Sequence, residues 1–139
     1  MASMSPSVLV SRRGRDRIRA GHPWVYRSDV QQVDAEPGDL VRVVTEPRRA
    51  LGWAFYSSQS QIALRMVTTE AGPFDERTWL MARIRAASAY RRSLDIDASA
   101  FRLVHAEADL LPSIVVDQYG DEAGRWLVVQ TLSQGSDRR

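Results

Sequence analysis

The stretch PGDLVRVVTEPRRALGWAFYSSQSQIALRMV, residues 37–67, contains β-rich runs separated by turn signals. The runs cover residues 40–44, 51–56 and 62–67, and residues 8–10 form a similar run earlier in the chain. Short strands spaced by about 8 to 12 residues with Gly and Pro between them are typical of a small barrel or a strongly bent sheet. The sequence therefore predicts an all-β module over this part of the chain.

The β-rich pattern ends at residues 71–73 (Ala-Gly-Pro), and a helical pattern that marks a second module follows. Asp75 is a suitable N-cap, and apolar side chains at steps of three and four predict a helix that ends near Leu94. The apolar stripe consists of Leu80, Ile84, Ala87, Tyr90 and Leu94. Further β-rich runs lie at 101–105, 113–117 and 125–132, with a turn at 119–121 between the last two. We therefore expect this helix to lie on a sheet.

These patterns predict the α+β class with a boundary near residue 72. We assign residues 1–71 to a small β-barrel module and residues 72–132 to a small α+β module. Residues 133–139 are polar and follow an apolar strand, so we expect them to begin a connection to a further domain outside this sequence.

The composition is that of an ordinary folded protein, with 44% hydrophobic and 26% charged residues among 139. The chain has no cysteine, which excludes disulfides, thiolate metal sites and cysteine nucleophiles. No apolar run approaches the ~20 residues that span a bilayer, and the first ten residues do not have the pattern of a signal peptide. We therefore expect no membrane partner and a cytoplasmic location.

All 19 basic residues are arginine, a bias that a GC-rich genome would also produce. Their distribution is more informative, because residues 11–27 contain six arginines and one aspartate, a net charge of +5. These arginines are Arg12, Arg13, Arg15, Arg17, Arg19 and Arg27. Such a cluster is typical of a nucleic-acid contact, since the guanidinium fork binds phosphate and stacks on bases. We predict that these arginines bind RNA.

Aromatic residues follow the arginines directly. His22, Trp24 and Tyr26 could stack on an unpaired base, a mode that RNA recognition often uses. The alternative is a solvated basic loop with Trp24 and Tyr26 in the core. We include His22 in the RNA contact and expect Trp24 to be a core residue.

A second constellation is His105-Ala106-Glu107-Ala108-Asp109. In an extended strand its two-residue spacing would place the histidine and both carboxylates on one face, where they could hold a metal or serve acid–base chemistry. The alternative is a turn after a strand, with the carboxylates bound to backbone amides or to arginines such as Arg102. We predict the structural role, with no metal site.

Cofactor and nucleophile motifs are missing from the sequence. The eight glycines never occur as Gly-x-Gly, and neither a P-loop nor a G-x-S-x-G elbow is present. We therefore predict that this chain has no catalytic residues and no cofactor site of its own.

Several motifs occur together along nearly the whole chain. They are RGR at 13–15, GHPWVY at 21–26, PGD at 37–39, ALR at 63–65, FRLVHAEAD at 101–109, LP at 111–112, VDQYGD at 116–121 and DRR at 137–139. Together they resemble the bacterial S-adenosylmethionine-dependent methyltransferases of large-subunit ribosomal RNA that carry an N-terminal PUA domain and modify cytosine at carbon 5. The run from 101 to 121 is the most distinctive part of the resemblance.

The resemblance implies an RNA-binding PUA barrel, a linker domain of strand-strand-helix-strand-strand type, and a Rossmann-like domain that would follow this sequence. S-adenosylmethionine would be the cofactor of the full-length parent, ribosomal RNA its partner, and this chain would be inactive alone. Interdomain or substrate-side roles would fall to Arg102, His105, Glu107, Asp109 and Asp117. Leu110 and Ser113 stand where the family tends to have glycine, so the turn around Leu111-Pro112 is expected to differ.

The favoured hypothesis is an RNA-binding and substrate-positioning fragment of such a methyltransferase. A stand-alone RNA-binding adaptor without catalysis is the rival, and a small metal-dependent enzyme built on His105, Glu107 and Asp109 is a third reading. The sequence leaves open the modified nucleotide and the oligomeric state.

Overall fold

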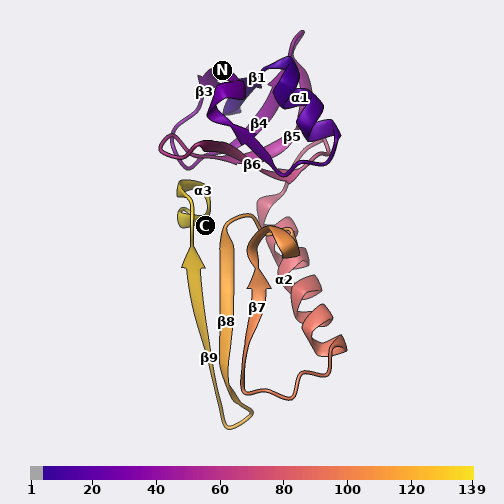
Figure 1. Ribbon diagram of the computed structural model, residues 1–139, viewed down its shortest axis with the longest axis vertical. Helices are drawn as coiled ribbons and strands as arrows, with labels where there is room; N and C mark the ends of the chain where they lie inside the picture. Colours follow the sequence, from indigo (N-terminus) through magenta and orange to yellow (C-terminus); the bar gives the residue numbers. More distant parts are fainter. Residues whose placement is uncertain (1–4) are drawn as a thin grey trace. The chain divides into compact units, whose positions relative to one another are not determined.

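The structure is a computed structural model that describes residues 5–139 (Figure 1). The chain divides into two compact units. Unit 1 comprises residues 1–73 together with 133–139, and unit 2 comprises residues 74–132. Unit 2 is therefore inserted, along the sequence, into the chain that forms unit 1.

Unit 1 is a curled six-stranded sheet with strand order β2-β6-β5-β4-β1-β3. Strands β1 and β4 are parallel, and the other neighbours are antiparallel. Its elements are β1 Ser7–Val10, α1 Arg12–Arg19, β2 Trp24–Tyr26, the 3-10 helix Arg27–Asp29, β3 Val30–Asp34, β4 Leu40–Thr45, β5 Arg49–Tyr56, β6 Ile62–Thr68 and α3 Gln134–Asp137.

The core of unit 1 lies on the inner face of this sheet. In β4, Val41 and Val43 are fully buried whereas Arg42 between them is exposed, as expected for side chains that alternate across a strand. Other core residues are Val8, Val10, Ile18, Val25, Leu51, Ala54, Leu64 and Met66. The four strands predicted over 8–67 are confirmed, and β2 and β3 are additional.

Gly52 permits a close approach of β5 to β6. Its φ is +134°, and a Cβ atom there would collide with the backbone oxygen of Thr68. Glycine is the residue that tolerates both the positive φ and the contact.

Residues 133–139 form part of unit 1. Helix α3 begins with a capping box between Ser133 and Ser136, and Gly135 lies so close to Phe55 that a side chain there would overlap it. Gln134 Oε1 accepts a hydrogen bond from the Ser58 N–H at 2.8 Å, and Arg138 pairs with Asp39 at 2.8 Å. This segment, which we expected to begin a connection, is thus folded against β5 and the turn before β4.

Unit 2 consists of one long helix and a three-stranded antiparallel sheet of order β7-β8-β9. Its elements are α2 Glu76–Ser93, β7 Ala100–His105, the 3-10 helix Ala106–Asp109, β8 Ile114–Asp121 and β9 Gly124–Thr131. Figure 1 shows α2 beside β7, with β9 at the opposite edge of the sheet. The strand-strand-helix-strand-strand order implied by the resemblance is therefore replaced by helix-strand-strand-strand in the described residues.

Helix α2 confirms the predicted cap, because the Asp75 side chain accepts a hydrogen bond from Thr78 N at 2.7 Å. The predicted apolar stripe was mostly wrong. Trp79 and Ala87 are buried, whereas Ile84 and Tyr90 are exposed. The buried positions are eight residues apart, and Arg91, one turn beyond Ala87, continues the same face. The α+β class is confirmed by both units.

Candidate nucleic-acid interface

The arginine-rich segment forms helix α1, so the solvated basic loop that was the alternative is not what the structure shows. Ser11 caps it, since its side chain accepts a hydrogen bond from Gly14 N at 3.1 Å. Gly14 is buried, and a Cβ atom there would lie 3.2 Å from Asp29 Cβ and 3.3 Å from Val10 Cβ. A glycine on this side of α1 therefore lets the helix lie close to the core, which directs the arginines on its other sides outward.

Arg13 has a structural partner. Its Nε donates to Asp29 Oδ1 at 2.7 Å, and Ser11 Oγ donates to the same oxygen at 3.0 Å. The Asp29 side chain is only 2% exposed, whereas that of Arg13 is 63% exposed. Arg13 therefore neutralises a buried carboxylate and anchors α1, a role that the sequence did not reveal.

Trp24 and Tyr26 lie on one face of the short strand β2, because Val25 between them points into the core and is fully buried. Both aromatic residues are half-buried, so the prediction that Trp24 is a core residue was wrong. The His22 ring lies 6.1 Å from each of the two rings, measured between centroids. These side chains form a continuous aromatic surface beside α1.

Each of the two larger rings has an arginine over it. The Arg17 guanidinium lies 5.1 Å from the centroid of Tyr26, and that of Arg65 lies 5.8 Å from the centroid of Trp24. Cation–π attraction holds such pairs together and leaves the guanidinium able to bind an anion. We call Arg17, His22, Trp24, Tyr26 and Arg65 the α1–β2 surface.

Arg65 was not among the predicted site residues. It lies in β6, directly opposite Trp24 in the register of β2 and β6. The available signal was that Arg65 interrupts the otherwise apolar run of the strand Ile62–Thr68. Without the pairing of β2 with β6, that signal did not connect Arg65 to the aromatic residues.

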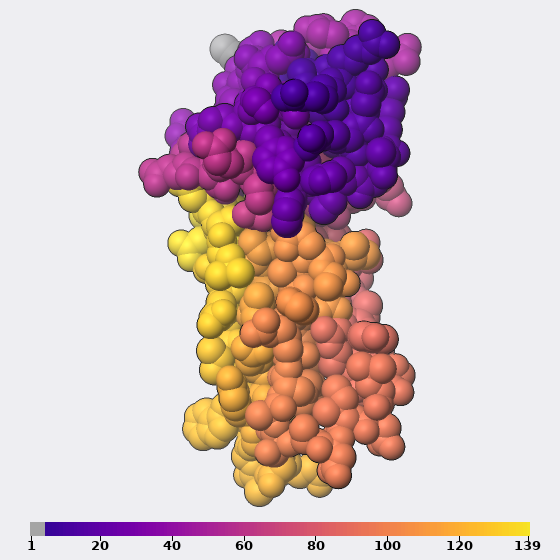
Figure 2. All heavy atoms as spheres, in the orientation of Figure 1, coloured from indigo at the N-terminus to yellow at the C-terminus, as the bar shows by residue number. Residues whose placement is uncertain are grey.

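The other predicted arginines differ in their surroundings. Arg15 pairs with its neighbour Asp16 at 2.7 Å, and Arg27 donates to the backbone oxygens of Ser58 and Ser60. Arg12 and Arg19 are exposed, and residues 5–139 offer neither of them an ion-pair partner. Figure 2 shows the N-terminal part of the chain, in indigo, at the surface of unit 1.

The segment from His105 to Asp109 does not continue the strand. Strand β7 ends at His105 and a 3-10 helix follows, so the three side chains do not share one face of a strand. Asp109 accepts two hydrogen bonds from Arg91, one of them at 2.7 Å, and one from the His105 N–H at 2.6 Å. Burial raises the pKa of Asp109, but these hydrogen bonds outweigh it and lower the pKa below its ordinary value.

The segment is thus a turn after a strand, in which the Asp109 carboxylate binds a backbone amide and Arg91. Arg102 instead pairs with Asp117 at 2.9 Å across β7 and β8. This hydrogen bond lowers the pKa of Asp117 and raises that of Arg102. Within residues 5–139, no group of three or more His, Asp or Glu side chains is placed to hold a metal ion.

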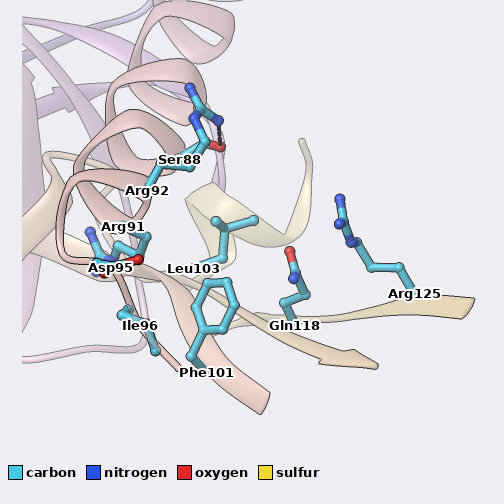
Figure 3. Close-up of a pocket in the computed structure, with 9 residues that line it drawn as sticks. All are labelled: Ser88, Arg91, Arg92, Asp95, Ile96, Phe101, Leu103, Gln118 and Arg125. Atoms are coloured by element: carbon cyan, nitrogen blue, oxygen red, sulfur yellow. Dashed lines mark hydrogen bonds between the residues drawn. The ribbon is translucent and has the colours of Figure 1, made fainter. Parts of the chain in front are cut away.

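A hollow of about 290 Å³ lies in unit 2 between α2 and the sheet (Figure 3). Phe101, Leu103 and Ile96 give it an apolar part, and Arg92 and Arg125 stand at its rim. Arg92 donates to Ser88 Oγ at 2.7 Å. The charged residues that line the hollow are arginines and Asp95. They include no histidine and no second carboxylate for paired acid–base chemistry.

Four glycines of unit 1 do not fit an S-adenosylmethionine site. Gly14, Gly38, Gly52 and Gly135 are each used in a close contact within unit 1. Their contacts are with Asp29, Arg138, Thr68 and Phe55, respectively. None of them opens a loop at the end of a strand for a cofactor, as a nucleotide-type site requires. No helix in the described part of the chain is long and apolar enough to cross a membrane.

Comparison with known proteins agrees with the division of the chain. The family model of the PUA-like domain matches residues 8–69. Ribosomal RNA large subunit methyltransferase I of Vibrio cholerae is 35% identical over 139 residues, which cover 96% of this chain and 34% of that protein. The Ribosomal RNA large subunit methyltransferase of Deinococcus radiodurans is 36% identical over 128 residues, covering 85% of this chain and 31% of that protein.

Solved structures have the same fold. A Streptococcus mutans protein described as a candidate S-adenosylmethionine-dependent methyltransferase matches with a TM-score of 0.78 at 14% identity, over 95% of this chain and 34% of that one. A candidate methyltransferase complexed with SAH gives a TM-score of 0.79 at 14% identity over the same shares. The chain spans about a third of the length of the curated relatives it matches. It therefore contains a PUA-like domain and is homologous to the N-terminal part of large-subunit ribosomal RNA methyltransferases.

Proposed function

We propose that this chain is the RNA-binding and substrate-positioning part of an S-adenosylmethionine-dependent methyltransferase that forms 5-methylcytosine in large-subunit ribosomal RNA. The observation that carries the proposal is the α1–β2 surface, where Arg17 and Arg65 lie over the rings of Tyr26 and Trp24. The homology to ribosomal RNA methyltransferases supports the choice of RNA. A ribosomal RNA partner also implies a cytoplasmic location, which is part of the proposal.

The net charges of the two units indicate which of them binds the RNA phosphates. The described arginines and acids of unit 1 number twelve and eight, a net charge of +4, whereas unit 2 has seven arginines and nine acids, a net charge of −2. Phosphate contacts supply most of the affinity in RNA binding, and they require cations. Unit 1 is therefore the side of the chain that holds the phosphate backbone, with Arg12 and Arg19 adding to Arg17 on α1.

The chemistry belongs to the rest of the parent protein. In the described residues, Asp109 and Asp117 are engaged by Arg91 and Arg102, and Gly14, Gly38, Gly52 and Gly135 lie in close contacts within unit 1. The role of this chain's own residues is to bind and orient RNA. When bound elsewhere in the parent, S-adenosylmethionine would supply the methyl group.

RNA binding is tested by the salt dependence of affinity. A variant with Arg12, Arg17 and Arg19 replaced by alanine should lower the log–log salt slope by about 2 units on a single strand, at ~0.7 for each lost phosphate contact. Arg77→Ala/Arg85→Ala is the matched control, because these exposed arginines lie on helix α2 of unit 2. Equal slopes in the wild type and the α1 variant would refute the assignment of phosphate binding to helix α1.

The modification itself is tested in cells. Bisulfite sequencing of ribosomal RNA from a strain that lacks the gene for this chain should show the loss of one 5-methylcytosine in the large subunit. Unchanged 5-methylcytosine throughout that RNA would refute the cytosine assignment and leave the RNA-binding role to the salt experiment.

A further inference from the structure

The sheet of unit 2 has an exposed aromatic pair. Tyr119 in β8 and Trp126 in β9 are directly opposite each other in the antiparallel register, so their side chains lie on the same face of the sheet. Tyr119 is 46% exposed and Trp126 is 73% exposed. Large aromatic rings in folded proteins are mostly covered, so a pair this open on one face indicates a contact with a ligand or partner.

Polar groups adjoin this pair. Ala100 lies opposite Tyr119, and Arg102 lies opposite Asp117, so these residues share the face with the two rings. A shallow, open hollow of about 510 Å³ is lined by Ala100, Phe101, Arg102, His105, Asp117 and Tyr119. The short side chain of Ala100 leaves room beside the tyrosine ring. The hollow thus combines an aromatic wall with hydrogen-bond donors and acceptors.

This combination suits a nucleobase better than a protein surface. A base has a flat face for stacking and an edge of donors and acceptors, which matches a ring next to a guanidinium, a carboxylate and an imidazole. An apolar protein partner would instead have to bury the Arg102–Asp117 ion pair, at a cost in desolvation. The favoured occupant is therefore an unpaired base.

The charge of unit 2 decides which part of RNA it binds. With a net charge of −2, and with Arg102 already paired to Asp117, this face offers little attraction for phosphate. Stacking on bases does not depend on counterion release and so depends little on salt.

We propose that the aromatic face, consisting of Tyr119, Trp126, Arg102, Asp117 and His105, is a second RNA contact that stacks on unpaired bases. The proposal rests on the proposed function only in requiring that the chain binds RNA. It assigns the two units different tasks: the α1–β2 surface holds phosphates, and the aromatic face reads unpaired nucleotides.

Fluorescence anisotropy with two labelled RNA probes tests this assignment. One probe is a stem-loop with an unpaired loop, and the other is the same stem as a blunt duplex. Trp126→Ala and Tyr119→Ala should each weaken binding of the stem-loop about fivefold or more, since base–aromatic stacking is worth at least that much per base. Binding of the duplex should change less than about twofold, and the salt slope should stay that of the wild type.

The matched controls lie in the same strand. Leu127 and Val129 are 57% and 61% exposed, and they point to the opposite face of β9 because they neighbour Trp126 and Val128 in an alternating strand. Leu127→Ala and Val129→Ala should leave both affinities unchanged. Trp126→Phe, which keeps a ring, should recover most of the binding of the stem-loop.

Three results would overturn the proposal. In the first, the wild type binds the stem-loop and the Trp126 and Tyr119 variants bind it equally well, which leaves the function of the α1–β2 surface intact. In the second, the variants of both faces lose affinity equally, which shows a general effect on β9. In the third, sedimentation velocity shows a dimer that Trp126→Ala converts to a monomer without loss of RNA binding, which makes the face a protein interface. A wild type that binds neither probe would refute the proposed function as well.

Discussion

Leu110 and Ser113 hold backbone conformations that side chains disfavour. Their φ values are +57° and +58°, in the left-handed region where a residue with a Cβ atom is strained by about 1 to 2 kcal/mol. The sequence already marked both positions, because the family that it resembles tends to have glycine there. The structure shows that the backbone keeps the shape glycine would favour.

We expect Leu110→Gly to stabilise unit 2 by about 1 kcal/mol, because glycine removes the strain and Leu110 is largely exposed, so little packing is lost. Thermal unfolding measures the effect. Leu110→Ala is the control and should give no such gain, since alanine keeps the Cβ atom. A Leu110→Gly variant that melts below the wild type would show that the leucine side chain contributes packing after all.

Asp109 should govern part of the acid stability. Its pKa is lowered in the folded state from an ordinary value of 3.8, so its contribution to stability is present above that value and is lost as the pH falls through the folded pKa. Asp109→Asn should therefore destabilise unit 2 at neutral pH by about 3 kcal/mol, since it leaves Arg91 without its carboxylate.

The diagnostic measurement is the melting temperature as a function of pH. The wild type should lose stability more steeply than Asp109→Asn below about pH 4, and the two curves should converge in acid. Parallel curves over that range would show that Asp109 does not titrate with folding.

Among the elements, helix α1 was not predicted from the sequence. The segment Arg12–Arg19 has a glycine at its third position and one buried apolar side chain, Ile18, so its periodic signal was too weak to predict a helix. Ser11 as a cap and arginines in the last turn were the usable signals. These two signals support a helix only when the close contact between Gly14 and Asp29 is known, because that contact explains the glycine within the helix.

The strands show the opposite case. Runs rich in β-branched residues, such as Leu40–Thr45, were predicted almost to their ends, because most of their side chains are both β-branched and buried. Strand β2 has three residues and β3 is nearly all exposed, so neither has a pattern of its own. Both exist because of pairing with β6 and β1, which a local pattern does not contain. The pairing of Trp24 with Arg65 was unpredictable for the same reason.

Because Arg13 anchors α1 and Arg12 does not, we expect their alanine substitutions to differ in their effect on stability. Arg13→Ala should destabilise unit 1 by about 1 to 2 kcal/mol, because the buried Asp29 loses a charged hydrogen bond whose arginine end is open to solvent. Arg12→Ala should change the stability by less than about 0.5 kcal/mol, since its side chain is exposed. Urea unfolding of both variants measures the difference, and equal midpoints would contradict the anchoring role.

Over the whole chain, the sequence order and the folded units do not coincide. Residues 133–139 come after unit 2 in the sequence but fold with unit 1. The local pattern showed only a polar segment. In the structure its glycine lies against Phe55, and its two arginines donate hydrogen bonds to the turn at 37–39. Arg139 lies 4.9 Å from the centroid of the Phe55 ring, and its Nη1 donates to the Gly38 oxygen at 3.1 Å.

Removing residues 133–139 should therefore weaken unit 1 selectively. Phe55 is 1% exposed when residues 133–139 are present. Their removal uncovers the Phe55 ring and eliminates the Arg138–Asp39 ion pair, which should lower the stability of unit 1 by about 1 to 3 kcal/mol. Because the units have separate cores, amide hydrogen exchange should rise in β4 and β5 while β7 and β8 keep their protection. Gly135→Ala, which forces a side chain against Phe55, should produce the same regional pattern in the full chain. A uniform rise in exchange over both units would show instead that they unfold as one.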